Sequence, residues 1–307
     1  MTWLTLTIAA QFLNSIVALI DKYLVTSKRV TTPLLYVFYT GVLALLGIII
    51  YIPSLFIANI PLPQFSLVTL LSPILFLFVI LAVLAQLTAL WGLFSALKKN
   101  DASDVMPVIG SLAAIFALII SYIWFQTILP VNFTFGFGLL VLGTLFVSHF
   151  RFSRKVFWYS ALSGFGFAIH GILLKEVLNQ SSFDTGFFWF SICMTVLSFF
   201  LFLLPNIRIN FGYQKKEKHI KKTGLILIST KIVAGIAGIL LIKAIELGEV
   251  SMVQALGGLQ FLFLFIFAVV LGPYTSVDFG ENNNRRDIYQ KLIAVTIIFT
   301  GFIVLFM

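Results

Sequence analysis

The stretch ALKKNDASDVMPVIG, residues 96–110, ends one apolar run and starts the next, with two lysines and an Asn-Asp turn in between. A similar phrase, AIELGEVSMVQALGG, occupies residues 244–258 and also joins two apolar runs. The identical positions pair Ala96 with Ala244, Ser103 with Ser251, Val105 with Val253 and Gly110 with Gly258. A phrase that returns at an equivalent junction indicates an internal repeat.

The composition favours a membrane protein. Hydrophobic residues make up 60% of the 307 residues and charged residues only 10%, whereas soluble domains are about one quarter charged. A bilayer span needs about 20 apolar residues, and ten runs of this kind predict an all-α integral membrane protein with ten transmembrane helices. The runs cover approximately residues 3–25, 33–52, 70–97, 102–125, 132–150, 156–178, 185–205, 223–245, 250–271 and 288–307.

The net charge of +9 does not indicate a nucleic-acid partner, because the positive residues lie in short connections between apolar runs. Most of the 20 Lys and Arg residues fall on the side opposite the termini. Cytoplasmic loops carry the excess of Lys and Arg. We therefore expect a multi-pass protein of the plasma membrane, with the lipid bilayer as its partner, cytoplasmic basic loops and both termini outside.

The position of the repeated phrase divides the chain into two halves, residues 1–150 and 151–307. The phrase lies between the third and fourth runs and again between the eighth and ninth, so each half contributes five spans. An odd number of spans turns the second half upside down relative to the first. Inverted repeats of this kind are a recurrent architecture of secondary transporters.

Four segments carry a resemblance to a known family. ALKKNDASDVMPVIGSLAAIF, residues 96–116, resembles the junction of the third and fourth helices in EamA-type members of the drug/metabolite transporter superfamily. AIELGEVSMVQALGGLQFLF, residues 244–263, resembles its second-half counterpart. WLTLTIAAQFLNSIVALIDKYLVTSK (residues 3–28) is similar to the family's first helix, and GFGFAIHGILLKEVL (residues 164–178) to the same element in the second half.

The resemblance implies a two-repeat transporter with a central cavity lined by spans 1–4 and 6–9 and with spans 5 and 10 at the periphery. It also implies alternating access, but its motifs specify the fold better than the substrate. As the function we expect export of a small metabolite, either anionic or zwitterionic, such as an amino acid. The basic loops lie opposite to those of many relatives, which leaves the direction of transport open.

Proline and glycine interruptions at matching places in the two halves point to a binding site. Pro107 and Gly110 fall in the fourth run, and Gly257 and Gly258 fall at the aligned place in the ninth. We expect helix breaks there whose backbone groups face a substrate. The alternative is close helix packing through small residues.

Lys231 is the most informative polar residue, because it lies about 12 Å into its run at about 1.5 Å of rise per residue. A lysine at the centre of a membrane helix costs about 2.5–3.5 kcal/mol on insertion scales, and no acidic residue is expected at a comparable depth. We expect Lys231 to face the cavity, to bind an anionic substrate group, and to be essential for transport. The alternative is that it extends toward the basic side or bonds backbone carbonyls.

Six further candidates share a polar or aromatic side chain near the middle of a run: Asn14, Gln86, Trp91, Ser111, His170 and Gln260. The three amides either line the cavity or bond between helices. His170 either relays protons, since the ordinary pKa of histidine is near neutral, or only packs and hydrogen-bonds. Trp91 would stack on a substrate.

Other functions lack a supporting pattern. The sequence has no G-x-S-x-G, H-E-x-x-H or P-loop motif, and its three histidines show no metal-ligand spacing, so we expect neither an enzyme nor a cofactor. Small multidrug-resistance relatives use a carboxylate in the first helix where this chain has Asn14, which disfavours cation/proton antiport. The alternative to a small-molecule transporter is a flippase for a lipid-linked phosphate or sugar carrier, and an intramembrane enzyme is the least favoured alternative. The sequence also leaves a homodimer open as the assembly.

Overall fold

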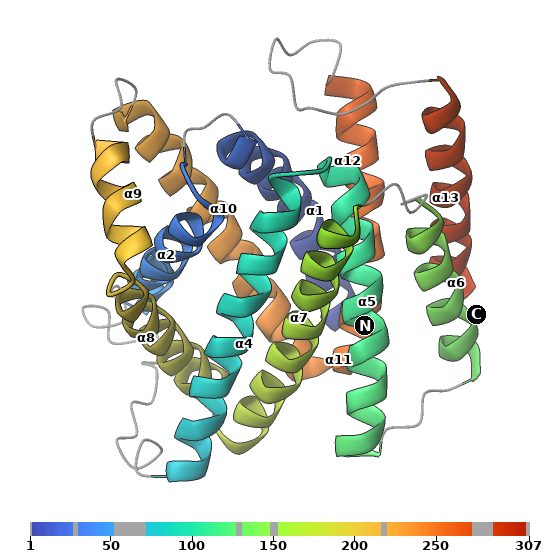
Figure 1. Cartoon of the computed structure of the whole chain (residues 1–307). Coiled ribbons are helices and arrows are strands. Elements are labelled where there is room, and N and C mark those ends of the chain that lie inside the picture. Colours follow the sequence, from blue (N-terminus) through green and yellow to red (C-terminus); the bar gives the residue numbers. More distant parts are fainter. Residues whose placement is uncertain are drawn as a thin grey trace.

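The computed structural model describes residues 2–26, 30–51, 72–126, 131–147, 153–215, 220–271 and 285–304, which contain helices and, within these ranges, no strand (Figure 1). The elements are α1 (Thr2–Thr26), α2 (Pro33–Leu43), the 3-10 helix η1 (Ala44–Tyr51), α4 (Pro73–Leu97), α5 (Ala102–Phe125), α6 (Val131–Val147), α7 (Arg154–Gln180), α8 (Phe183–Leu201), α9 (Pro205–Lys215), α10 (Ile220–Leu247), α11 (Val250–Ala255), α12 (Gly258–Leu271) and α13 (Arg285–Val304).

Each of the ten predicted apolar runs contains helix, the second as α2 with η1 and the ninth as α11 with α12. Within the described residues, 7 helices are long and apolar enough to cross a membrane. The shorter apolar helices are Pro33–Ile49, Phe133–Phe146 and Leu292–Val304. The prediction of an all-helical chain with several helices fit to span a bilayer is confirmed. The basic segments at residues 27–29, 148–152 and 216–219 lie outside the described residues, as does the polar segment 272–284.

Hydroxyl side chains fix where several helices begin. Thr32 accepts a hydrogen bond from the backbone N–H of Leu35 at the start of α2, and Ser182 accepts one from Thr185 at the start of α8. Such N-caps satisfy backbone donors that have no partner within the helix. Pro33 occupies the first helical position of α2, where its fixed φ favours the helix and its missing N–H costs nothing.

Two local predictions are wrong. The polar segment 206–222 was expected to be a connection, but α9 fills Pro205–Lys215, beginning with a proline at its first position. The break expected at Pro107 and Gly110 is absent, because α5 continues through both residues. Pro107 lies in the second turn of α5, where proline gives up a single backbone hydrogen bond. The break expected in the ninth run is present at the turn between α11 and α12.

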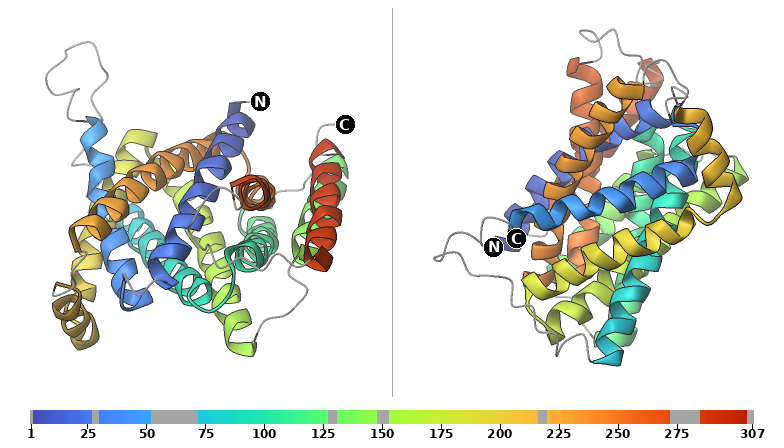
Figure 2. Two further views of the ribbon diagram at one scale, coloured as in Figure 1. Left: turned by 90° about the horizontal axis from the view of Figure 1, so that it is seen from above. Right: turned by 90° about the vertical axis from the view of Figure 1, so that its left-hand side faces the viewer.

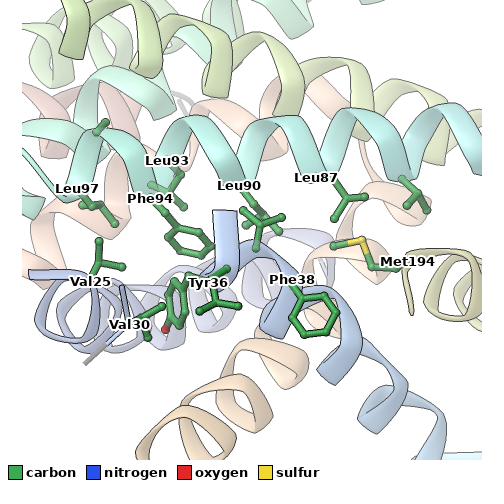
Figure 3. Packing of buried hydrophobic residues seen from close by; sticks show 14 of the residues in the cluster. Val25, Val30, Tyr36, Phe38, Leu87, Leu90, Leu93, Phe94, Leu97 and Met194 are labelled. Atoms are coloured by element: carbon green, nitrogen blue, oxygen red, sulfur yellow. The ribbon is translucent and has the colours of Figure 1, made fainter. Parts of the chain in front are cut away.

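The closest helix pairs join segments that are far apart in the sequence. α4 packs along α7, α1 packs along α10, and α6 packs against α13 at one edge of the bundle (Figures 1 and 2). The largest buried cluster lies between α4 and the α1–α2 region, where Phe94 and Leu97 face Val25 and Tyr36 (Figure 3). Phe94 and Tyr36 contact each other with ring centroids 4.4 Å apart. This packing joins α1, α2 and α4 at the end of the bundle where α1 and α4 end.

The contact between α4 and α7 depends on Gly166, and we expect Gly166→Ala to destabilise the fold by about 1–3 kcal/mol. A Cβ there would lie 2.9 Å from the carbonyl oxygen of Ala85 and 3.0 Å from the backbone nitrogen of Ala89, so the two helices would have to separate. Thermal unfolding of the purified proteins measures the effect. Gly138→Ala is the control, because its Cβ meets no atom within 4 Å and removal of a helical glycine stabilises by about 0.5–1 kcal/mol. Equal stability of the two variants would contradict this account.

Candidate functional site

A cavity of about 410 Å³ lies in the centre of the bundle. Its lining residues come from α1, α2, η1, α4, α5, α7, α8, α10, α11, α12 and the turn between the last two; among the described residues none belongs to α6 or α13. Small-molecule sites are typically concave, mostly apolar, and about 300–1,000 Å³ in volume. The size and central position of the cavity are those of a binding site for a small molecule.

A few polar side chains interrupt the apolar lining. They are Gln11, Asn14, Asp21, Thr40, Gln86, Ser191, Lys231, Gln254 and Gln260. Four predicted site residues, Asn14, Gln86, Lys231 and Gln260, therefore line one cavity although they come from α1, α4, α10 and α12.

Lys231 forms a buried ion pair with Asp21. Its Nζ lies 3.0 Å from Oδ1 and 3.1 Å from Oδ2 of Asp21, and the two side chains are only 4% and 6% exposed. The hydroxyl of Tyr36 donates a short hydrogen bond to Oδ1 of the same carboxylate. The ammonium also lies 4.4 Å from the ring centroid of Tyr36 and 5.2 Å from that of Phe94, distances at which an aromatic face attracts a cation.

The expectation that Lys231 has no acidic partner is wrong. Asp21 and Lys22 are neighbours near the end of α1, and both are buried and bond in different directions. The depth of a residue along its own helix does not give its depth in the bundle when helices are tilted. Asp21, near the end of α1, therefore meets Lys231, which lies in the interior of α10.

The amides in the cavity are only partly satisfied. Nε2 of Gln260 donates to the backbone oxygen of Asn14 at 3.1 Å, and Nε2 of Gln254 donates to that of Phe167 at 3.3 Å. Oε1 of Gln86 is buried and has no hydrogen-bond partner within the described part of the chain. Gln86 therefore lines the cavity with a side chain whose own carbonyl oxygen is buried and unbonded within the described residues.

Three predicted site residues lie outside the cavity lining. The ring of Trp91 is 36% exposed and packs edge-to-face on Tyr159. Ser111 donates to the backbone oxygen of Pro107 at 2.8 Å and bonds the hydroxyl of Thr144 on α6. His170 bonds the backbone oxygen of Ala82 through Nδ1 at 3.1 Å. All three contribute to helix packing.

The proline and glycines that were predicted near the site also fall into residues that line the cavity and residues that do not. Gly110 and Gly257 line the cavity, whereas Pro107 and Gly258 do not. A Cβ on Gly110 would lie 3.8 Å from the backbone carbon of Gly257, so α5 approaches the α11–α12 turn closely at these two glycines. A Cβ on Gly258 would instead meet Thr144 at 2.8 Å.

Two lysines bind helix ends on either side of the cavity. Nζ of Lys22, on α1, donates to the backbone oxygens of Leu97 at 2.9 Å and Asn100 at 2.6 Å, where α4 ends. Nζ of Lys175, on α7, donates to three backbone oxygens where α10 ends, those of Ile245 (2.9 Å), Glu246 (2.9 Å) and Gly248 (3.1 Å). Carbonyls at a helix C-terminus have no intrahelical partner, and a cation there also interacts favourably with the helix dipole.

We expect Gln86→Leu to leave the fold unchanged or more stable by about 1–3 kcal/mol, because it removes an unsatisfied buried oxygen at little change in size. Gln260→Leu is the matched control, since it removes an existing hydrogen bond worth about 0.5–1.5 kcal/mol. Thermal unfolding of both variants measures the difference. A loss of stability in Gln86→Leu as large as that in Gln260→Leu would show that the Gln86 amide has a structural role.

Comparison with known proteins supports the fold alone. No protein-family profile matches the sequence, and no curated protein matches it. A solved structure described only as "Crystal structure of protein" is similar, with a TM-score of 0.63, 16% sequence identity, and coverage of 96% of each chain.

Proposed function

We propose that this chain is a secondary membrane transporter that moves a small metabolite through the central cavity by alternating access. The observation that supports the proposal most is the cavity of about 410 Å³, lined mostly by helices long and apolar enough to cross a bilayer. Intramembrane ionisable residues mark substrate or ion pathways, and Asp21 and Lys231 both line this cavity.

The proposal includes two inverted five-span halves, as in the EamA-type drug/metabolite transporters. Its support is that the two lysine-capped helix ends fall at aligned positions of the repeated phrase. Lys22 bonds Leu97 and Asn100, and Lys175 bonds Ile245 and Gly248, which are the residues that the alignment places opposite each other. We place the protein in the plasma membrane with its basic loops in the cytoplasm, acting as an exporter.

In this proposal Lys231 does not bind an anionic substrate group through an unpaired ammonium, as the sequence alone led us to expect. Its ammonium is already paired with Asp21, so an anionic solute would have to displace a carboxylate held by two contacts. A zwitterion such as an amino acid, which offers both charges, fits the paired site better than an anion does.

Solute flux into proteoliposomes tests transport directly. Vesicles containing the purified protein, preloaded with an unlabelled metabolite mixture, should accumulate radiolabelled members of that mixture faster than protein-free vesicles. Thermal stabilisation against the same metabolites selects which to label, because a ligand at about 100 times its dissociation constant adds about 2.7 kcal/mol. Exchange no faster than in protein-free vesicles for every stabilising metabolite would refute the proposal.

A further inference from the structure

The charged groups of the cavity leave it without net charge. Asp21 and Lys231 are the only charged lining residues among those that the structure describes, and each neutralises the other at 3.0 Å. An added anion or cation would leave one buried charge without its partner, which is strongly unfavourable in a low-dielectric site. The cavity therefore favours a molecule whose own net charge is zero.

The amides supply the hydrogen bonds for a polar head group. Gln86, Gln254 and Gln260 line the cavity, and Gln254 and Gln260 each donate through Nε2 to one backbone oxygen. Each primary amide carries two donors and a carbonyl acceptor, so a head group that both donates and accepts can be satisfied here.

The wall formed by α10 is apolar and recessed. Among the described residues, no atom would lie within 4 Å of a Cβ on Gly235 or on Gly238, and both glycines line the cavity. Beside them, Ile232 and Ile236 line the cavity and yet are 48% and 49% exposed.

Gln11 and Phe94 line the same cavity and are only 6% and 0% exposed, so the α10 wall is much more exposed than the wall at these two residues. The cavity therefore reaches the outer surface of the bundle along the edge of α10. Leu46 and Gly47 of η1 also line it, and η1 lies beside α10 on the face turned toward the viewer in the right-hand view of Figure 2.

We propose that the solute is an amphipath of zero net charge, whose hydrogen-bonding head lies among the amides and whose apolar part lies in the recess at Gly235 and Gly238. Its apolar part reaches the bilayer between α10 and η1. This substrate class deepens the proposed transport function and rests on it for the step across the membrane, whereas binding itself needs only the cavity.

Equilibrium dialysis of the purified protein against three radiolabelled probes tests the class. N-acetylglycinamide supplies an uncharged amide head, N-acetylleucinamide adds an apolar side chain, and N-acetylleucine keeps that side chain but carries a carboxylate. We expect the leucinamide to bind at least about tenfold more tightly than the glycinamide, because burial of a leucine side chain is worth that much. We also expect the carboxylate to bind at least about tenfold more weakly than the leucinamide.

Gly235→Leu tests the recess, and Gly224→Leu is its matched control on the same helix. Within the described part of the chain neither position has an atom within 4 Å of an added Cβ, but Gly224 does not line the cavity. Gly235→Leu should lower leucinamide affinity at least about tenfold while leaving the melting temperature and the glycinamide affinity near those of the wild type. Gly224→Leu should change neither affinity.

Each failure has its own signature. Equal binding of the two amides, tighter binding of the carboxylate, or no binding of any probe overturns the inference. Leucinamide binding that depends on Gly235 but brings no flux in proteoliposomes refutes transport and leaves the binding site intact. Flux of other solutes, with no preference for the apolar side chain, refutes the substrate class and leaves transport intact.

Discussion

Replacing Lys231 with Met should destabilise the fold by about 3–5 kcal/mol and abolish transport, because it leaves the Asp21 carboxylate buried without its partner. Asp21 is 4% exposed, and its other described contact is the hydroxyl of Tyr36, which cannot replace a full positive charge. The stability loss is measured as a lower midpoint in thermal or denaturant unfolding of the purified protein. Solute flux is measured on the fraction that remains folded.

A double-mutant cycle separates the ion pair from the individual side chains. Asp21→Asn alone should cost a similar amount, since it leaves the Lys231 ammonium unpaired. The double variant Asp21→Asn, Lys231→Met should be clearly more stable than either single variant, because no buried charge is left, but should still lack transport. Stability losses that simply add would show that the two side chains act independently, and would contradict the pairing.

Part of this pair was predictable from residue spacing. Lys231 stood out by its depth in an apolar run, whereas Asp21 lies close to the end of α1 and beside Lys22, and so resembles an ordinary terminal charge. Yet Gln11, Asn14 and Asp21 are spaced at i, i+3 and i+10, which places them on one face of a helix. All three line the cavity, so the helical face gives a better signal than depth.

The same reasoning explains why some candidates lie outside the cavity lining. Trp91 follows Gln86 by five residues, a spacing that turns it away from the face on which Gln86 lies, and it is found on the outside of α4 against Tyr159. Ser111 follows the cavity residue Gly110 by one position and therefore faces α6. Polarity inside an apolar run indicates a partner in the bundle, and the helical face decides whether that partner is a solute or another helix.

The fold was more predictable than the site, because the bilayer constrains helix length while the site depends on which helices meet. Apolar runs of suitable length sufficed to locate the helical segments, although α9 was missed because its polar composition resembles a loop. Helix pairing left no clear trace in the sequence. α1 packs along α10 and α4 along α7, so the closest pairs join the first half of the chain to the second.

The second large effect concerns Lys22 and Lys175, which we expect to keep opposite ends of the cavity closed. α1 and α4 meet over a shorter stretch than α1 and α10 do, and α7 and α10 meet over a shorter stretch than α7 and α4 do. Lys22 joins α1, which packs along α10, to the end of α4, and Lys175 joins α7, which packs along α4, to the end of α10. Hydrogen bonds from a charged donor are worth about 1.5–3 kcal/mol each. Removing one lysine should therefore favour opening at its own end.

A cysteine at Gly235 in a Cys193→Ala background reports this opening, because position 235 lines the cavity and Cys193 is the chain's single cysteine. In vesicles of known orientation, Lys22→Met should speed labelling by an impermeant thiol reagent added on the side where α1 and α4 end, and Lys175→Met should speed it from the other side. A shift of about 1.4 kcal/mol corresponds to a tenfold faster rate if opening limits labelling.

Because both substitutions remove a cation from a helix end, a general loss of stability would speed labelling from both sides in both variants. Only alternating closure at the two helix ends gives opposite sidedness.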